Sequence, residues 1–234
     1  DKDENAKAKE NIIKRLAELQ MSDGGFAWIK YDGCKSSLYC TGTVLELIGE
    51  IQQLGFLTDD SRVDAMVDKA IKYYDREYLK FFSKLKLGKK ASFAGYADYV
   101  YVRQLHKQHS VPAANQKYYK RIVDDIAKHW GDGTTYSKAY YAIILNREGR
   151  KNDARRITES IRQFGITTPA RGMYWDTPDR TSRFGNDQVS YTSNVLLALN
   201  EVDRRTDEID QIRKWILLNK QTNDWGSSSL AADA

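Results

Sequence analysis

Residues 38–82 read LYCTGTVLELIGEIQQLGFLTDDSRVDAMVDKAIKYYDREYLKFF, and this stretch decides the fold. Its second half, 61–82, places an apolar residue every three or four positions in an otherwise charged segment, which is typical of a helix with one buried face. Its first half, 38–54, is apolar around most of the helical circumference, which predicts a helix buried on several sides. The polar residues 58–61 provide an N-cap for the second helix. The stretch therefore combines a buried helix with an outer helix that has one charged face.

The same alternation of outer and buried helices extends along the whole chain. No segment alternates between apolar and polar residues over the length of a strand, so we expect an all-α protein. The segment 41–45 (TGTVL) of the first buried helix aligns with 192–196 (TSNVL), which indicates an internal repeat. The other outer helices are expected at 4–20, 113–129, 152–164 and 206–220, and the other buried helices at 96–105, 135–146 and 190–202.

Similar turns follow two of the outer helices. The segments 19–28 (LQMSDGGFAW) and 220–226 (KQTNDWG) both place a Gln near a helix end, followed by Asp, Gly and an aromatic residue. Gly and Asp close turns, so we expect the aromatic residues, Trp28 and Trp225, to wedge between neighbouring hairpins.

The repeats predict the architecture of the chain. Comparable turn aromatics recur at irregular intervals, which favours an α/α toroid of helical hairpins over a regular solenoid. We expect a single domain over residues 1–234. The last repeat stops at 224–229, before its inner helix is complete, and the chain begins within a helical pattern. We therefore expect a truncated last hairpin and a chain that is part of a longer protein.

Composition and charge exclude several classes of protein. The 234 residues are 41% hydrophobic and 29% charged, which is ordinary for a globular chain. No apolar run is long enough to span a bilayer, so we expect no direct membrane insertion by this segment. With 37 basic and 32 acidic residues, the net charge of +5 is not an electrostatic signature by itself.

One local excess of positive charge has two interpretations, a phosphate-binding patch or a solvated helix end. No aromatic or Gly-rich nucleic-acid motif accompanies it, so we expect no nucleic-acid partner. The lysines concerned are Lys80, Lys84, Lys86, Lys89 and Lys90.

Two cysteines are too few for a disulfide scaffold, although Cys34 and Cys40 are candidates for one bridge in an oxidising compartment. A zinc site needs about four ligands, and the three histidines lie far from the cysteines in the sequence. We therefore expect no metal and no other cofactor. The histidines are His106, His109 and His129.

Several motifs resemble one known family. The segment 23–26 (DGGF), together with 37–47, resembles the early hairpins of the thioester domain of alpha-2-macroglobulins and complement components. The segment 172–175 (GMYW) is similar to a long late loop of that domain, and 215–225 (WILLNKQTNDW) to its final outer helix and turn. The resemblance spans the chain in order and is closest to bacterial members.

The resemblance implies an α/α toroid within an endopeptidase inhibitor that traps proteases in a bacterial cell envelope, in the periplasm or at the cell surface. Its partners would be the other domains of the parent chain and the target proteases.

The chemistry of that family is missing from this segment. Its reactive site joins a Cys to a Gln three residues later as an internal thioester. Here Ser37 stands three residues after Cys34, and Thr43 three residues after Cys40, so neither cysteine can form it. In the family the motif lies before the first of these turns, so it would precede this chain or be absent. Some members use a His in the stretch corresponding to 84–93, which contains none here. We therefore expect a non-catalytic domain.

A toroidal carbohydrate-active enzyme, either a glycosidase or a polysaccharide lyase, is the first alternative. Inverting glycosidases need two carboxyl groups about 6.5–9.5 Å apart. Each candidate here is also suited to a cap or a turn. The candidates are Asp98, Asp176, Asp179 and Asp187.

A pure protein-interaction module is the second alternative. The late turn offers aromatic and arginine side chains, which are enriched at protein contacts. The other interpretation is that this loop packs on its own toroid. The residues concerned are Tyr174, Trp175, Arg180, Arg183 and Phe184.

Overall fold

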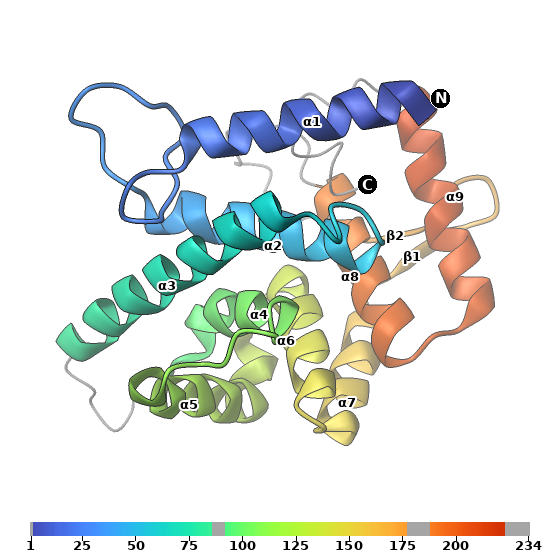
Figure 1. The fold of residues 1–234 in the computed structure, drawn as a ribbon. Coiled ribbons are helices and arrows are strands. Elements are labelled where there is room, and N and C mark those ends of the chain that lie inside the picture. The colour runs from blue at the N-terminus through green and yellow to red at the C-terminus, as the bar shows by residue number, and fades with distance from the viewer. Residues whose placement is uncertain (1, 86–91, 177–187, 223–234) are drawn as a thin grey trace. The chain divides into compact units, whose positions relative to one another are not determined.

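The fold is seen in a computed structural model that describes residues 2–85, 92–176 and 188–222 (Figure 1). The chain divides into an N-terminal unit, residues 1–122, and a C-terminal unit, residues 123–234. The N-terminal unit contains α1 (Lys2–Leu19), α2 (Leu38–Gln53), α3 (Ser61–Lys84), a 3₁₀ turn (Ala94–Tyr96), α4 (Ala97–Leu105) and the first part of α5 (Ala113–His129). The C-terminal unit contains the end of α5, a 3₁₀ turn (Trp130–Asp132), α6 (Thr135–Arg147), α7 (Lys151–Arg162), β1 (Ile166–Thr168), β2 (Gly172–Tyr174), α8 (Gln188–Val202) and α9 (Thr206–Thr222).

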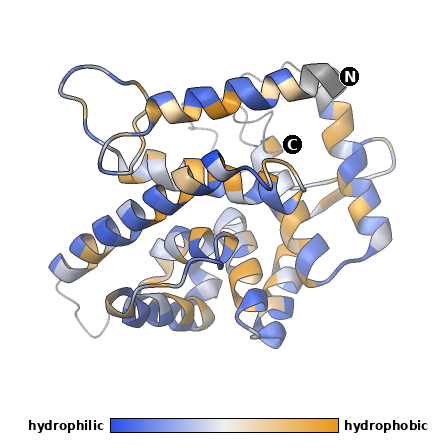
Figure 2. Cartoon of the chain, viewed as in Figure 1, coloured by the Kyte–Doolittle hydropathy of each residue, from blue (hydrophilic) through white to orange (hydrophobic). Residues whose placement is uncertain are grey.

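The all-α prediction is confirmed, and each helix expected from the sequence is present with its ends shifted by a few residues. The two predicted kinds of helix are also present. On α3 the buried side chains follow one face, and Figure 2 shows hydrophilic residues along much of this helix. On α4 the buried residues are nearly continuous, from Ala97 to Leu105. On α8 the buried run begins at Val189 and includes five consecutive residues.

A short β-hairpin in the C-terminal unit was not predicted. Strands β1 and β2 pair antiparallel, with Thr167 opposite Met173. Each strand has three residues, which is too short to show an alternating pattern in the sequence. Gly172 has a φ of 86°, and a Cβ at this position would lie 2.2 Å from the carbonyl oxygen of Gln211 on α9. Only glycine lets β2 approach α9 this closely.

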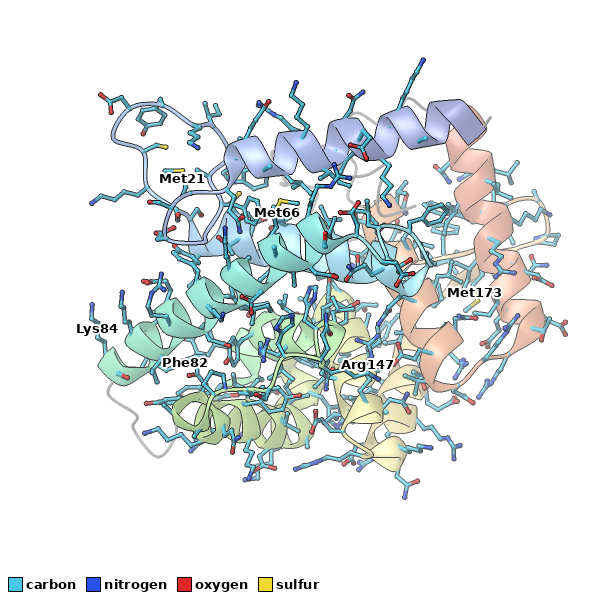
Figure 3. The ribbon with its side chains drawn as sticks, in the orientation of Figure 1. Met21, Met66, Phe82, Lys84, Arg147 and Met173 are labelled. Carbon is cyan, nitrogen blue, oxygen red and sulfur yellow. The ribbon has the colours of Figure 1, made fainter. Side chains whose placement is uncertain are left out.

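The turn after α1 joins α1 to α3 through one glutamine. Gln20 Nε2 donates to the carbonyl oxygen of Gly24 at 3.0 Å and to that of Met66 on α3 at 2.9 Å. Gly24 has a φ of 93°, and a Cβ there would lie 2.4 Å from the carbonyl oxygen of Lys69. Figure 3 shows Met21 in this turn and Met66 on α3. Gln20 and Gly24 therefore hold the turn against α3.

The aromatic residue that packs in this turn is Phe26, and the expectation for Trp28 was wrong. Phe26 is 1% exposed, and its N–H donates to Thr41 Oγ1 on α2 at 2.9 Å. It is bridged by backbone pairing to both Gln20 and Ser37, which directs its ring into the core. Trp28 lies beyond these bridges and is 59% exposed. The corresponding Trp225 lies outside the described residues.

This difference can be measured by urea unfolding. Phe26→Ala should lower the free energy of unfolding by about 3–5 kcal/mol, because it removes a fully buried ring and leaves a cavity. Trp28→Ala is the matched control, and its effect should stay within about 0.5 kcal/mol because the side chain is exposed. Equal losses in the two variants would contradict the assignment of Phe26 as the packing residue.

An ionic cluster joins α1 to the start of α3. Asp60 caps α3 by accepting from the N–H of Arg62 at 3.1 Å, and Arg62 Nη2 donates to Asp60 Oδ2 at 2.9 Å. The same Nη2 donates to Glu10 Oε1 on α1 at 2.7 Å, and Lys9 Nζ lies 3.6 Å from Asp60 Oδ2. The hydrogen bonds from Arg62, and then the positive charges of Arg62 and Lys9, hold the pKa of Asp60 well below its usual range.

Asp60→Asn keeps a capping side chain but removes the charge. Because the folded-state pKa of Asp60 is lowered, its carboxylate stabilises the fold above the unfolded pKa of about 4, and this contribution disappears as the pH falls further. The variant should therefore be less stable than the natural chain at neutral pH, and the difference should shrink steadily as the pH falls below about 4. Thermal unfolding across this range measures it, with Asp59→Asn as the control. A difference that does not change with pH would contradict the role of the charge.

Candidate functional site

A cluster of tyrosines lies between α3 and α4 in the N-terminal unit. Tyr74 and Tyr78 are one helical turn apart on α3, so their rings share one face. Tyr99 of α4 packs against both, with ring centroids 5.8 Å from Tyr74 and 4.7 Å from Tyr78. Gly42 of α2 leaves room for the cluster, since a Cβ there would lie 3.1 Å from the Tyr74 ring. All three tyrosines are buried, so their hydroxyl groups need partners.

Asp98 accepts the hydrogen bond of one of these hydroxyls. It lies in the first turn of α4 and is exposed, while the Tyr78 hydroxyl that donates to its Oδ2 belongs to a buried ring. Desolvation at this position raises the pKa of Asp98, and the bond from Tyr78 lowers it by less. Burial also raises the pKa of Tyr78, with a further increase from the charge of Asp98. Tyr78 therefore remains a neutral donor, and Asp98 holds its proton more strongly than an ordinary aspartate.

Glu46 is a second carboxylate near this cluster that the sequence analysis did not identify. Burial raises the pKa of Tyr74 well above its usual value, and the charges of Asp98 and Glu46 add to this effect. Glu46 therefore lies close enough to act on the same ring from α2. In the sequence, Glu46 is distinguished only as the single charged residue in the apolar stretch from 44 to 48.

A separate carboxylate, Asp75, is part of a buried network. Tyr99 Oη donates to Asp75 Oδ1 at 2.7 Å, and Asn115 Nδ2 on α5 donates to Tyr99 Oη at 3.0 Å and to the carbonyl oxygen of Asp75 at 2.9 Å. Arg103 Nε lies 3.4 Å from Asp75 Oδ1, and Arg103 Nη2 donates to the carbonyl oxygen of His109 at 2.6 Å. Burial raises the pKa of Asp75, and Arg103 opposes this increase. The network joins α3, α4 and α5.

The two aspartates differ in what they can do chemically. A carboxyl group with a raised pKa can act as a general acid. The pKa of the Asp98 carboxyl group is raised by burial, while other parts of the residue are exposed. Asp75 is buried and held by Arg103, so it serves the packing of the helices. His106 is buried as well, with Nε2 2.6 Å from the carbonyl oxygen of Leu45, and desolvation lowers its pKa. It is therefore neutral and structural.

Of the other candidate carboxylates, the structure describes only Asp176. Asp176 lies in the C-terminal unit, where its Oδ1 accepts from Gln188 Nε2 at 2.6 Å. Asp179 and Asp187 lie outside the described residues.

The late turn packs on its own unit where the structure describes it. Trp175 is buried, and its Nε1 donates to the carbonyl oxygen of Ile161 at 2.8 Å. Trp175 therefore follows the interpretation in which the loop packs on its own unit, because the indole N–H finds its partner on α7. Tyr174 is half-buried and stacks on Trp215 of α9, with ring centroids 5.3 Å apart. The remaining candidates, Arg180, Arg183 and Phe184, lie outside the described residues.

The cysteines and lysines have ordinary surroundings. Cys40 is a buried free cysteine on α2, and Cys34 is a half-buried free cysteine whose Sγ lies 4.0 Å from Met21 Sδ. Lys80 pairs with Glu77 at 2.8 Å. Lys84 ends α3, as Figure 3 shows, and the other three lysines of that group lie outside the described residues. Within the described ranges, no group of three or more His, Cys, Asp or Glu residues is placed to hold a metal ion.

Comparison with known proteins gives no relative from which to infer the function. No protein-family model matches this chain, and no curated protein matches it. Of the helices in the described ranges, none has the length and hydrophobicity to cross a bilayer. The function must therefore be argued from the contacts and charges of the chain itself.

The hydrogen bond to Asp98 can be tested by NMR titration of its carboxyl carbon. Tyr78→Phe removes a donor that lowers the pKa of Asp98, so the pKa should rise further in this variant. Tyr31→Phe is the matched control, since Tyr31 is exposed on a loop, and it should leave the titration unchanged. A lower pKa in Tyr78→Phe would contradict the assigned bond.

Proposed function

We propose that this chain is a non-catalytic α/α-toroid domain of an alpha-2-macroglobulin-like protein that traps proteases. The observation that carries the proposal is the packing of buried helices on one another in both units. In the N-terminal unit α2 packs on α4, and in the C-terminal unit α6 packs on α8. The one-sided helices pack on these buried helices, α3 on α2 and α7 on both α6 and α8. Such an inner layer covered by outer helices is the arrangement that a toroid of hairpins requires.

Several charged side chains connect helices of the chain, which supports a structural role for the domain. Arg162 of α7 donates to Asp203 Oδ2 at 2.7 Å and to the carbonyl oxygen of Asp203 at 2.7 Å, in the loop between α8 and α9. Its Nε donates to Glu208 Oε2 on α9 at 2.8 Å. Arg147 of α6 makes two hydrogen bonds of 2.8 Å to Glu201 of α8. These charged groups are used to hold helices together, as the Asp75–Arg103 pair is in the N-terminal unit.

In this proposal the partners are the other domains of the parent protein and its target proteases, and the location is the periplasm or the cell surface. The motifs at 23–26 and 215–225 support the family assignment.

The trapping function is tested with the natural full-length protein. A protease enclosed by a trap loses access to large substrates, whereas small peptides still diffuse to its active site. We therefore expect the protein to block cleavage of casein by trypsin while cleavage of a short chromogenic peptide continues. The isolated 1–234 chain is the control and should block neither. Equal loss of both activities, or no loss of either, would contradict the proposal.

A carbohydrate-active enzyme is a second candidate, and one observation favours it. Asp98 is an exposed residue at the start of a buried helix, and its carboxyl group has a raised pKa. Incubation of the chain with a panel of oligosaccharides separates the two proposals. We expect no cleavage, and no incorporation of labelled methylamine. Glycan cleavage that is lost in Asp98→Asn would assign the chain to the second class instead.

A further inference from the structure

Four large apolar side chains are exposed within residues 28–39, which comprise the end of the segment that joins α1 to α2 and the first two residues of α2. We call residues 28–39 the aromatic loop. The four residues are Trp28 (59% exposed), Ile29 (71%), Tyr31 (68%) and Tyr39 (75%). Soluble proteins tolerate single exposed apolar residues, but a local group of this kind marks a binding surface.

The base of the loop is fixed to the N-terminal unit. The N–H of Ser37 donates to the carbonyl oxygen of Phe26 at 2.9 Å, and Ser36 Oγ donates to Asp23 Oδ1 at 2.6 Å. At the tip the N–H of Cys34 donates to the carbonyl oxygen of Tyr31 at 3.1 Å, which closes a turn. Figure 1 shows the loop extending past the end of α1. Binding would therefore order little additional backbone, which reduces its entropic cost.

The two aromatic rings nearest the base form one face. Trp28 and Tyr39 have ring centroids 6.3 Å apart and an interplanar angle of 48°. Trp and Tyr are the residue types that contribute most to binding when a partner covers them. The turn at residues 19–28 thus buries Phe26 and exposes Trp28 next to Tyr39.

Two of the three charged residues of the loop flank Tyr31 with opposite charges. Lys30, Asp32 and Lys35 are all exposed, and their side chains form no hydrogen bond or ion pair with the residues that the structure describes. Lys30 and Asp32 are the direct neighbours of Tyr31 on either side. A two-fold axis at Tyr31 would bring Lys30 of each copy next to Asp32 of the other.

We propose that the aromatic loop binds the same loop of a second copy of this chain, with the two-fold axis at Tyr31. A two-fold interface uses the same patch on both copies, so its charges must complement themselves, and the Lys30–Asp32 order does so. The apolar residues form the centre of the contact and the charged residues its rim. One loop is smaller than the surface that a stable dimer buries, so the association is weak and depends on concentration. The inference does not depend on the proposed function.

Sedimentation velocity of the natural chain is the first test. Between about 1 μM and about 1 mM we expect a monomer that converts to a dimer as the concentration rises. Trp28→Ser with Tyr39→Ser should weaken the association at least about tenfold. Leu54→Ser is the matched control, since Leu54 is 74% exposed outside the loop, and it should not change the association. A monomer at every concentration, or a dimer unaffected by the double variant, would overturn the proposal.

Charge reversal tests the position of the axis. Lys30→Asp alone and Asp32→Lys alone each place like charges opposite one another, so each variant should dimerise at least about fivefold more weakly than the natural chain. The chain that carries both changes restores opposite charges and should dimerise within about threefold of the natural one.

A mixture of the two single variants is the most specific measurement. One copy then carries two acidic residues beside Tyr31 and the other two basic residues, so the mixture should associate more tightly than either variant alone. Far-UV circular dichroism of every variant confirms that the helices are retained. Failure of both the mixture and the double change to restore association would overturn the two-fold arrangement.

Discussion

The amide of Gln20 holds the first turn of the N-terminal unit on α3. One NH₂ group donates both to Gly24, within the turn, and to Met66, on the neighbouring helix. Without that amide the turn loses both hydrogen bonds, each of which typically contributes about 0.5–1.5 kcal/mol. The position of this turn also decides where Phe26 enters the core. The packing of α1, α2 and α3 thus depends on a contact between one side chain and two backbone groups.

The helices were predictable because their periodicity is a local property of the sequence. The stripe on α3 and the nearly continuous burial of α4 both follow from which positions are apolar. The start of α3 was also predictable, since the polar residues 58–61 were expected to provide its N-cap and Asp60 does so. The β-hairpin was missed because its short strands depend on the close approach of Gly172 to α9, and no local pattern shows that approach.

The candidate site was predictable only in part, because its partners come from different helices. Asp98 was identified as a carboxylate at the start of a buried helix, but nothing in the sequence links it to Tyr78, twenty residues earlier. Arg103 and Asn115 meet Asp75 only after α3, α4 and α5 have packed. The choice between Phe26 and Trp28 failed for the same reason, since both aromatic residues suit a turn and only the backbone bridges of Phe26 decide which one is buried.

The same turn connects stability with the exposed surface of the N-terminal unit. Its buried half is tied by Gln20 and Phe26, and Ala27 is the last buried residue before Trp28 reaches solvent. Trp28 is therefore exposed as a consequence of how Phe26 is buried, and the bond from Ser37 back to Phe26 keeps the two ends of the loop together. A loop with a fixed base can present apolar side chains without loss of the fold beneath it. This separation of roles explains how one short motif can stabilise the unit and also provide the surface on which a second copy binds.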